Sequence, residues 1–162
     1  MNLIYIIISK LLLIIHYCIN LHINHLNSLL IILGYTILFV NYSEEYFVNK
    51  EKKEEVLLTS PQKEAIGYAL LLSYYITGVL YTDYFMIQIY IPLLGYSSGI
   101  LSRILYINNH IRRVLSNIEI FLLFLFYSSY VVSHIESKEY IGVVGSLISV
   151  FFYINLGLFT NS

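Results

Sequence analysis

A single acidic residue, Glu119, falls inside a long apolar stretch of the chain. The stretch reads RRVLSNIEIFLLFLFYSSYVV, and Glu119 stands about eight residues, or about 12 Å along a helix, from its beginning. A carboxyl group at membrane depth is costly unless it is neutral or paired. Two interpretations follow: Glu119 takes up and releases protons as part of a relay, or it only hydrogen-bonds a neighbouring helix.

Polar residues precede Glu119 at helical spacing. Ser116 lies three residues and Arg112 seven residues before it. At helical spacing after it, Leu122, Leu123 and Phe126 are apolar, and Tyr130 follows. This spacing predicts a polar entry from one side to a carboxyl in the membrane. Carboxylates or lysines that face Glu119 from adjacent helices would favour the relay, whereas a wall of leucine or lipid would disfavour it.

The histidines are the other candidate ligands. His16, His22 and His25 could bind haem or a metal, but they stand among asparagines in an expected turn, which favours solvation at the interface. His110 and His134 are expected in loops. The sequence has no Ser-His-Asp set, glycine-rich phosphate loop, HExxH or CxxC motif. A soluble-type active site is therefore not predicted.

Composition indicates an integral membrane protein. Of 162 residues, 58% are hydrophobic and 12% are charged, against about 25% charged in soluble domains. So short a chain cannot bury this much apolar surface, so the lipid bilayer is an expected partner. The 17 tyrosines suit the headgroup zone. The net charge of −1 argues against nucleic-acid binding, and Cys18, the only cysteine, excludes an internal disulfide.

The apolar tracts predict an all-α, polytopic transmembrane helical bundle with five or six spans. Six is the preferred number, and five results if the short first tract lies in the membrane interface. Residues 43–64 hold ten of the 19 Asp, Glu, Lys and Arg residues and form an expected charged loop. The expected spans are residues 3–19, 23–42, 65–82, 84–107, 111–133 and 139–159.

Basic residues in the short connections predict the orientation. Arg103, Arg112 and Arg113 cluster about the connection at 104–111. Alternation of the spans then puts the loop at 43–64 on the same, positive side of the membrane. The loops at 83 and 134–139 face the other side.

Small residues recur at spacings of four or eight in two of the expected spans. Gly95 and Gly99 belong to the span at 84–107, and Gly145, Ser149 and Gly157 to the span at 139–159. Small side chains at this spacing let helices approach closely in lipid. Plain helix packing is the expected role.

The segment from His110 to Glu119, followed by Ile-Phe-Leu-Leu, resembles the second helix of NADH dehydrogenase subunit 4L, the NuoK-like subunit of respiratory complex I. That family has three helices, and the second carries a functional glutamate. The resemblance implies that residues 84–162 form a three-helix unit. Tyr153 stands where the family has a second glutamate, which is a departure because tyrosine is a poor proton carrier near neutral pH.

The resemblance gives no counterpart to residues 1–83. These would comprise two N-terminal membrane helices at 1–42, the charged matrix-side loop at 43–64 and an additional helix at 65–83.

The resemblance implies a multi-pass protein of the mitochondrial inner membrane. The chain would be a membrane-arm subunit of proton-pumping NADH:ubiquinone oxidoreductase, with Glu119 in the proton relay and Arg112 and Arg113 as loop charges that bias it. It would bind no cofactor or metal itself, since NADH, FMN, iron–sulfur clusters and ubiquinone would belong to partner subunits.

Two alternatives remain open. One is a non-catalytic structural membrane subunit of another organellar respiratory complex or of ATP synthase. The other, an independent small transporter, is less favoured because the chain shows no internal repeat.

Overall fold

Six α-helices make up the chain in this computed structural model, which describes residues 4–19, 21–51, 60–81, 87–104 and 109–160. The prediction of an all-α bundle is confirmed. The helices are α1 (Ile4–Ile19), α2 (Leu21–Glu51), α3 (Ser60–Tyr81), α4 (Ile87–Ile104), α5 (Asn109–Glu136) and α6 (Tyr140–Thr160).

Two predicted boundaries are wrong. Helix α2 begins at Leu21 and continues to Glu51, so the expected turn about His22 and the first part of the charged loop are helical. No proline interrupts residues 21–51, and proline is the residue that ends a helix most strongly. Helix α3 begins at Ser60, with Pro61 in its first turn, where a missing N–H has no cost. The predicted loop residues 52–59 and the turn at Asp83 lie outside the described residues.

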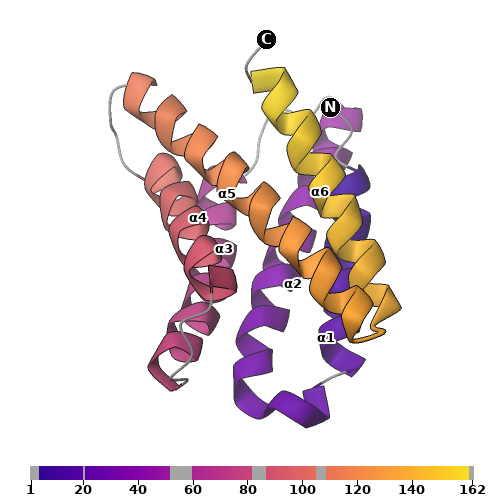
Figure 1. Cartoon of the computed structure of the whole chain (residues 1–162). Helices are drawn as coiled ribbons and strands as arrows, with labels where there is room; N and C mark the ends of the chain where they lie inside the picture. Colours follow the sequence, from indigo (N-terminus) through magenta and orange to yellow (C-terminus); the bar gives the residue numbers. More distant parts are fainter. Residues whose placement is uncertain (1–3, 20, 52–59, 82–86, 105–108, 161–162) are drawn as a thin grey trace.

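The six helices form a closed ring. Each described helix packs against the helix before and after it in the chain, and α6 packs against α1. Successive helices run up and down, so both chain ends lie at the same end of the bundle (Figure 1). Side chains from all six helices can therefore meet in the centre.

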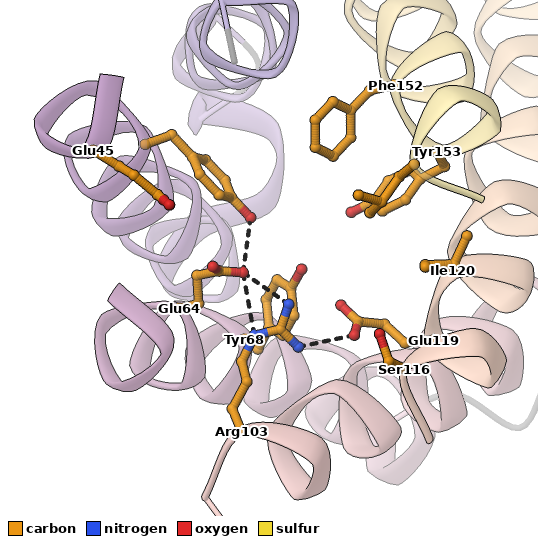
Figure 2. Close-up of a pocket in the computed structure, with 11 residues that line it drawn as sticks. Glu45, Glu64, Tyr68, Arg103, Ser116, Glu119, Ile120, Phe152 and Tyr153 are labelled. Atoms are coloured by element: carbon orange, nitrogen blue, oxygen red, sulfur yellow. Dashed lines mark hydrogen bonds and ion pairs between the residues drawn. The ribbon is translucent and has the colours of Figure 1, made fainter. Parts of the chain in front are cut away.

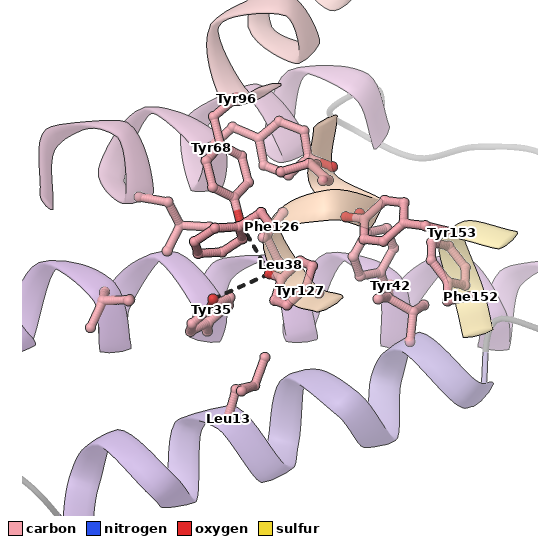
Figure 3. Close-up of a cluster of buried hydrophobic side chains, with 14 of the residues drawn as sticks. Leu13, Tyr35, Leu38, Tyr42, Tyr68, Tyr96, Phe126, Tyr127, Phe152 and Tyr153 are labelled. Carbon is pink, nitrogen blue, oxygen red and sulfur yellow. Dashed lines mark hydrogen bonds between the residues drawn. The ribbon is translucent and has the colours of Figure 1, made fainter. Parts of the chain in front are cut away.

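Tyrosines fill the centre of this ring (Figure 3). The side chains of Tyr35, Tyr68, Tyr96 and Tyr127 are almost fully buried. The Tyr127 hydroxyl lies 3.2 Å from the hydroxyl of Tyr35 and 3.0 Å from that of Tyr96, so the hydroxyls satisfy one another. The headgroup zone predicted for the tyrosines would place them at the helix ends. These four lie instead in the centre of the bundle, where their rings are buried.

Small residues permit close contact between neighbouring helices, as predicted. A Cβ atom at Gly95 would lie 3.1 Å from Leu123 Cδ2 of α5, and one at Gly145 would lie 3.2 Å from Leu13 Cγ of α1. The Ser9 hydroxyl of α1 also donates a hydrogen bond of 2.8 Å to the Gly145 carbonyl. The backbones of α1 and α6 thus approach closely.

The outer surface of the bundle is apolar. Each of the six helices exposes large apolar side chains, for example Ile8, Leu33, Ile66, Leu94, Phe121 and Phe151. Of the described helices, two, α5 and the Tyr140–Gly157 part of α6, are long and apolar enough to cross a membrane, judged by length and composition alone. Helix α1 is apolar but shorter.

Candidate functional site

Glu119 is the first buried residue of α5. Its residue surface is 3% exposed, whereas the residues from 109 to 118 are exposed or half-buried. The first turns of α5 extend past the end of α4 (Figure 1). Glu119 contacts Arg103, which lies in the last turn of α4. Its carboxyl group lies between helices, as the relay interpretation requires.

Arg103 of α4 joins Glu119 to a second carboxylate (Figure 2). Its Nη1 donates a hydrogen bond of 2.8 Å to Glu119 Oε2. Its Nη2 donates one of 2.8 Å to Glu64 Oε2 of α3, and its Nε donates one of 3.2 Å to the same oxygen. One guanidinium group therefore connects two carboxylates from different helices. We call Glu64, Arg103 and Glu119 the carboxylate cluster.

Neighbouring groups hold this cluster in place. Arg103 Nη1 also donates to the Gly99 carbonyl at 2.9 Å, and the guanidinium lies over the Tyr68 ring at 4.7 Å. The Tyr42 hydroxyl donates to Glu64 Oε2 at 3.1 Å. Gly99 leaves room for the contact, because a Cβ atom there would lie 2.9 Å from Glu119 Cδ. The charged groups are thus fixed by at least four helices.

A cavity of about 180 Å³ adjoins the cluster. Its lining includes both clustered carboxylates, Ser116 of α5 and Tyr153 of α6. The carboxyl group of Glu45 also lines it, from α2 (Figure 2). A polar space of this size can hold several water molecules.

With both carboxylates ionised, the cluster would carry more negative than positive charge. Arginine keeps its proton in proteins, so the pair of carboxylates faces a single permanent cation. Glu64 lies directly before the predicted span at 65–82. Burial raises the pKa of its carboxyl group, the Arg103 guanidinium lowers it, and the nearby Glu119 raises it. One proton bound to either carboxyl would make the cluster neutral.

The predicted site residues have different surroundings. Ser116 lines the cavity with Glu119, as its spacing suggested. Arg112 and Arg113 lie exposed in the first turns of α5, and their influence on Glu119 stays a prediction. Tyr153 is buried, 3% exposed, and lines the same cavity; its equivalence to a family glutamate also stays a prediction.

Sequence reasoning missed three residues of the interior. The sequence predicts a charged loop for Glu64 and uses Arg103 only to orient the spans, and Lys10 has no role in the predicted site. Lys10 is 1% exposed in the structure. A cation inside an apolar helix was the available signal for both Lys10 and Arg103.

Lys10 belongs to the tyrosine centre. Its ammonium donates a hydrogen bond of 3.0 Å to the Tyr127 hydroxyl and lies 4.9 Å from the centre of the Tyr35 ring. Further along α5, the Tyr130 hydroxyl accepts a hydrogen bond of 2.9 Å from Tyr17. Hydroxyl groups thus continue through the ring beyond the carboxylate cluster.

The inner face of α5 ends at a second polar group. His134 lies 15 residues after Glu119, or about 22 Å along the helix, and contacts Glu139 and His16. His16 is 5% and His134 7% exposed, so the expectations of a solvated His16 and of His134 in a loop are wrong. Both side chains are buried where α1 and α5 end. The side chains of His22 and His25 lie outside the described residues.

No protein-family model, no curated protein and no solved structure matches this chain. The function is therefore inferred from the site itself.

Proposed function

We propose that this chain is a proton-relay subunit of a membrane complex, and that its carboxylate cluster takes up and releases one proton. The observation that carries the proposal is the sharing of one half-buried guanidinium, that of Arg103, by the carboxylates of Glu64 and Glu119. Two like charges so close together do not both ionise at low cost, so one carboxyl favours the protonated form. Uptake of a proton changes the cluster from net negative to neutral.

The surroundings provide routes to and from the cluster. Water in the adjoining cavity can exchange protons with Glu119, and Glu45 adds negative charge that favours uptake. In the other direction lie the hydroxyls of the tyrosine centre, which can each donate and accept a hydrogen bond. Lys10 provides a second group there that can bind or release a proton.

The apolar outside and polar inside support placement in a bilayer with five or six spans. Large apolar side chains face outward on every described helix, while Lys10 and Glu119 are buried within the ring. Exposed apolar surface on this scale marks contact with lipid or with other membrane subunits. Contact between Glu64 and Arg103 agrees with the predicted placement of residues 43–64 and 104–111 on one side.

The more specific form of the proposal is a membrane-arm subunit of proton-pumping NADH:ubiquinone oxidoreductase in the mitochondrial inner membrane. It rests on the resemblance of residues 110–119, and NADH, FMN, iron–sulfur clusters and ubiquinone would then belong to partner subunits. Glu64 lies outside the three-helix unit at 84–162, so the additional helices would contribute directly to the relay.

A structural subunit of another respiratory complex or of ATP synthase is the second candidate. The observation that favours it is the closed set of contacts about Arg103, which binds both carboxylates and the Gly99 carbonyl. Such contacts also fix α3, α4 and α5 relative to one another. Under this alternative, the cluster has an architectural role only.

The test is Glu119→Gln in the native complex, after partner subunits have been identified by copurification in mild detergent. We expect proton pumping driven by NADH oxidation to be lost while the complex still assembles, because glutamine keeps the shape but cannot exchange the proton. Glu136→Gln, an exposed acid on the same helix, is the matched control. Full pumping by the Glu119 variant would contradict the relay, and failed assembly would favour the structural role.

A further inference from the structure

Three elements bring two imidazoles and a carboxylate together at the end of the bundle remote from the carboxylate cluster. His16 lies in the last turn of α1, His134 in the last turn of α5, and Glu139 directly before α6. The end of α1 and the turn between α5 and α6 lie side by side at the lower right of Figure 1. We call these three residues the histidine cluster.

Two of the three separations between ligand atoms are close to those that a small metal ion requires. His16 Nε2 lies 3.5 Å and His134 Nδ1 lies 3.0 Å from Glu139 Oε2. One ligand atom from each residue lies within 4.8 Å of the other two. Zinc with bonds of about 2.0–2.1 Å at tetrahedral angles separates its ligand atoms by about 3.3 Å. Small shifts of the side chains would therefore complete a site.

His134 is held firmly at this end of the bundle. Its Nε2 atom is buried and has no hydrogen-bond partner among the residues that the structure describes, so Nδ1 carries its polar contact. The ring is held against Gly142, where a Cβ atom would lie 3.0 Å from His134 Cγ. Packing therefore holds the ring in the orientation that directs Nδ1, the nitrogen opposite Nε2, toward Glu139.

We propose that the histidine cluster binds one divalent transition-metal ion, with Zn²⁺ the best-suited ion. Two imidazole nitrogens and one carboxylate oxygen are a common set of three protein ligands for zinc. Magnesium and calcium prefer all-oxygen sites, so the two histidines discriminate against them. The site shares no residue with the carboxylate cluster, so this proposal does not depend on the proton relay.

The ion can reach the site from outside the bundle. The Glu139 side chain is 38% exposed, whereas the two histidine side chains are 6% and 8% exposed. Glu139 thus forms the mouth of the site, and the fourth position of the ion would face water on that side. The ion would join the ends of α1 and α5 to the start of α6.

The test uses the full chain, purified in detergent, stripped with a chelator and then dialysed against Zn²⁺. We expect one zinc ion per chain. His16→Gln, His134→Gln and Glu139→Gln should each weaken zinc binding at least tenfold, since each removes one ligand. Excess Mg²⁺ should not displace the zinc. Cobalt gives a second measurement, because Co²⁺ bound in this site should show visible absorption that the three variants lose.

Matched controls separate the site from adventitious binding. His110→Gln removes a histidine and Glu136→Gln an acid outside the cluster, and both should bind zinc as the unchanged chain does. Circular dichroism checks that each variant keeps its helices, and Glu139→Gln, at the partly exposed mouth, is the variant least expected to unfold. Absence of zinc from the unchanged chain, or unaltered affinity in Glu139→Gln, would overturn the proposal.

Discussion

The two ends of the bundle hold opposite arrangements of charged and titratable groups. In the carboxylate cluster, one permanent cation, Arg103, is shared by the carboxylates of Glu64 and Glu119. In the histidine cluster, one carboxylate, that of Glu139, is shared by His16 and His134.

The difference predicts what each end binds. The first end has two carboxylates and one guanidinium, so its charge is balanced only when one carboxyl binds a proton. The second end offers two nitrogen atoms and an oxygen atom to a cation, and imidazole is a better ligand for transition metals than for hard cations. Between them lies a layer of neutral tyrosines with a single lysine, Lys10.

The largest effect is expected from Arg103→Met. Removing the cation leaves two carboxylates close together and poorly solvated, which should lower the free energy of unfolding by about 3–5 kcal/mol at neutral pH. The loss should shrink as the pH falls, because protonation removes the uncompensated charge. Thermal unfolding in detergent, followed by circular dichroism across a pH series, measures both effects.

Arg113→Met is the control for that change, because Arg113 is exposed on α5. Its effect should stay within about 0.5 kcal/mol and should not depend on pH in the same way. Equal losses in the two variants would mean that the carboxylate cluster is not an electrostatic unit.

Zinc should have the next largest effect on stability, and it should act only through the histidine cluster. At a free concentration one hundred times its dissociation constant, the ion should stabilise the folded chain by about 2.7 kcal/mol. A chelator should therefore lower the melting temperature of the unchanged chain but not that of Glu139→Gln. A similar chelator effect in both proteins would remove the distinction between the two ends.

A smaller effect is expected from Gly99→Ala. The new methyl group would meet Glu119 Cδ and the Tyr68 ring, each at 2.9 Å, and would push the carboxylate from Arg103. We expect a loss of about 1–3 kcal/mol, typical of overpacking. Gly157→Ala is the matched control, because its nearest neighbour would be Ile120 Cγ2 at 3.6 Å. Comparable losses in both variants would argue against a special role of Gly99.

The smallest effect is expected from Glu44→Gln. Glu44 pairs with Lys63 between α2 and α3, but its side chain is 49% exposed. An exposed pair of this kind contributes below about 1 kcal/mol, and less in high salt. A loss as large as that of Arg103→Met would show that burial does not distinguish the two ion pairs. Urea titration at low and high salt provides the comparison.

The helices and one member of the site were predictable from sequence, but the partners were not. Long apolar tracts fix where helices form, and a lone acid within one of them points to Glu119. Its partners depend on how the helices pack: the first turns of α5 extend past α4, which brings Glu119 level with Arg103. The sequence around Glu64 is rich in charged residues, as in a loop. Its place on a helix becomes clear only because α3 begins at Ser60.

The histidine cluster was unpredictable for a related reason. His16 and His134 come from opposite ends of the chain, and only the closure of the ring between α1 and α6 brings them together. Local composition, rich in asparagine near His16, favoured a solvated turn instead. The positions of the tyrosines were also not predictable, because an amphipathic side chain suits both the headgroup zone and the centre of the bundle.

The most direct test of the central claim is infrared difference spectroscopy of the chain in lipid nanodiscs, as the pH is lowered and raised. The carboxylate cluster should give the carbonyl band of one protonated, buried carboxyl group per chain at neutral pH. Either Glu119→Gln or Glu64→Gln should abolish that band, because the remaining carboxylate then pairs with Arg103 alone, whereas Glu136→Gln should leave it. Absence of the band from the unchanged chain, or its persistence in both cluster variants, would contradict a shared proton between these two residues.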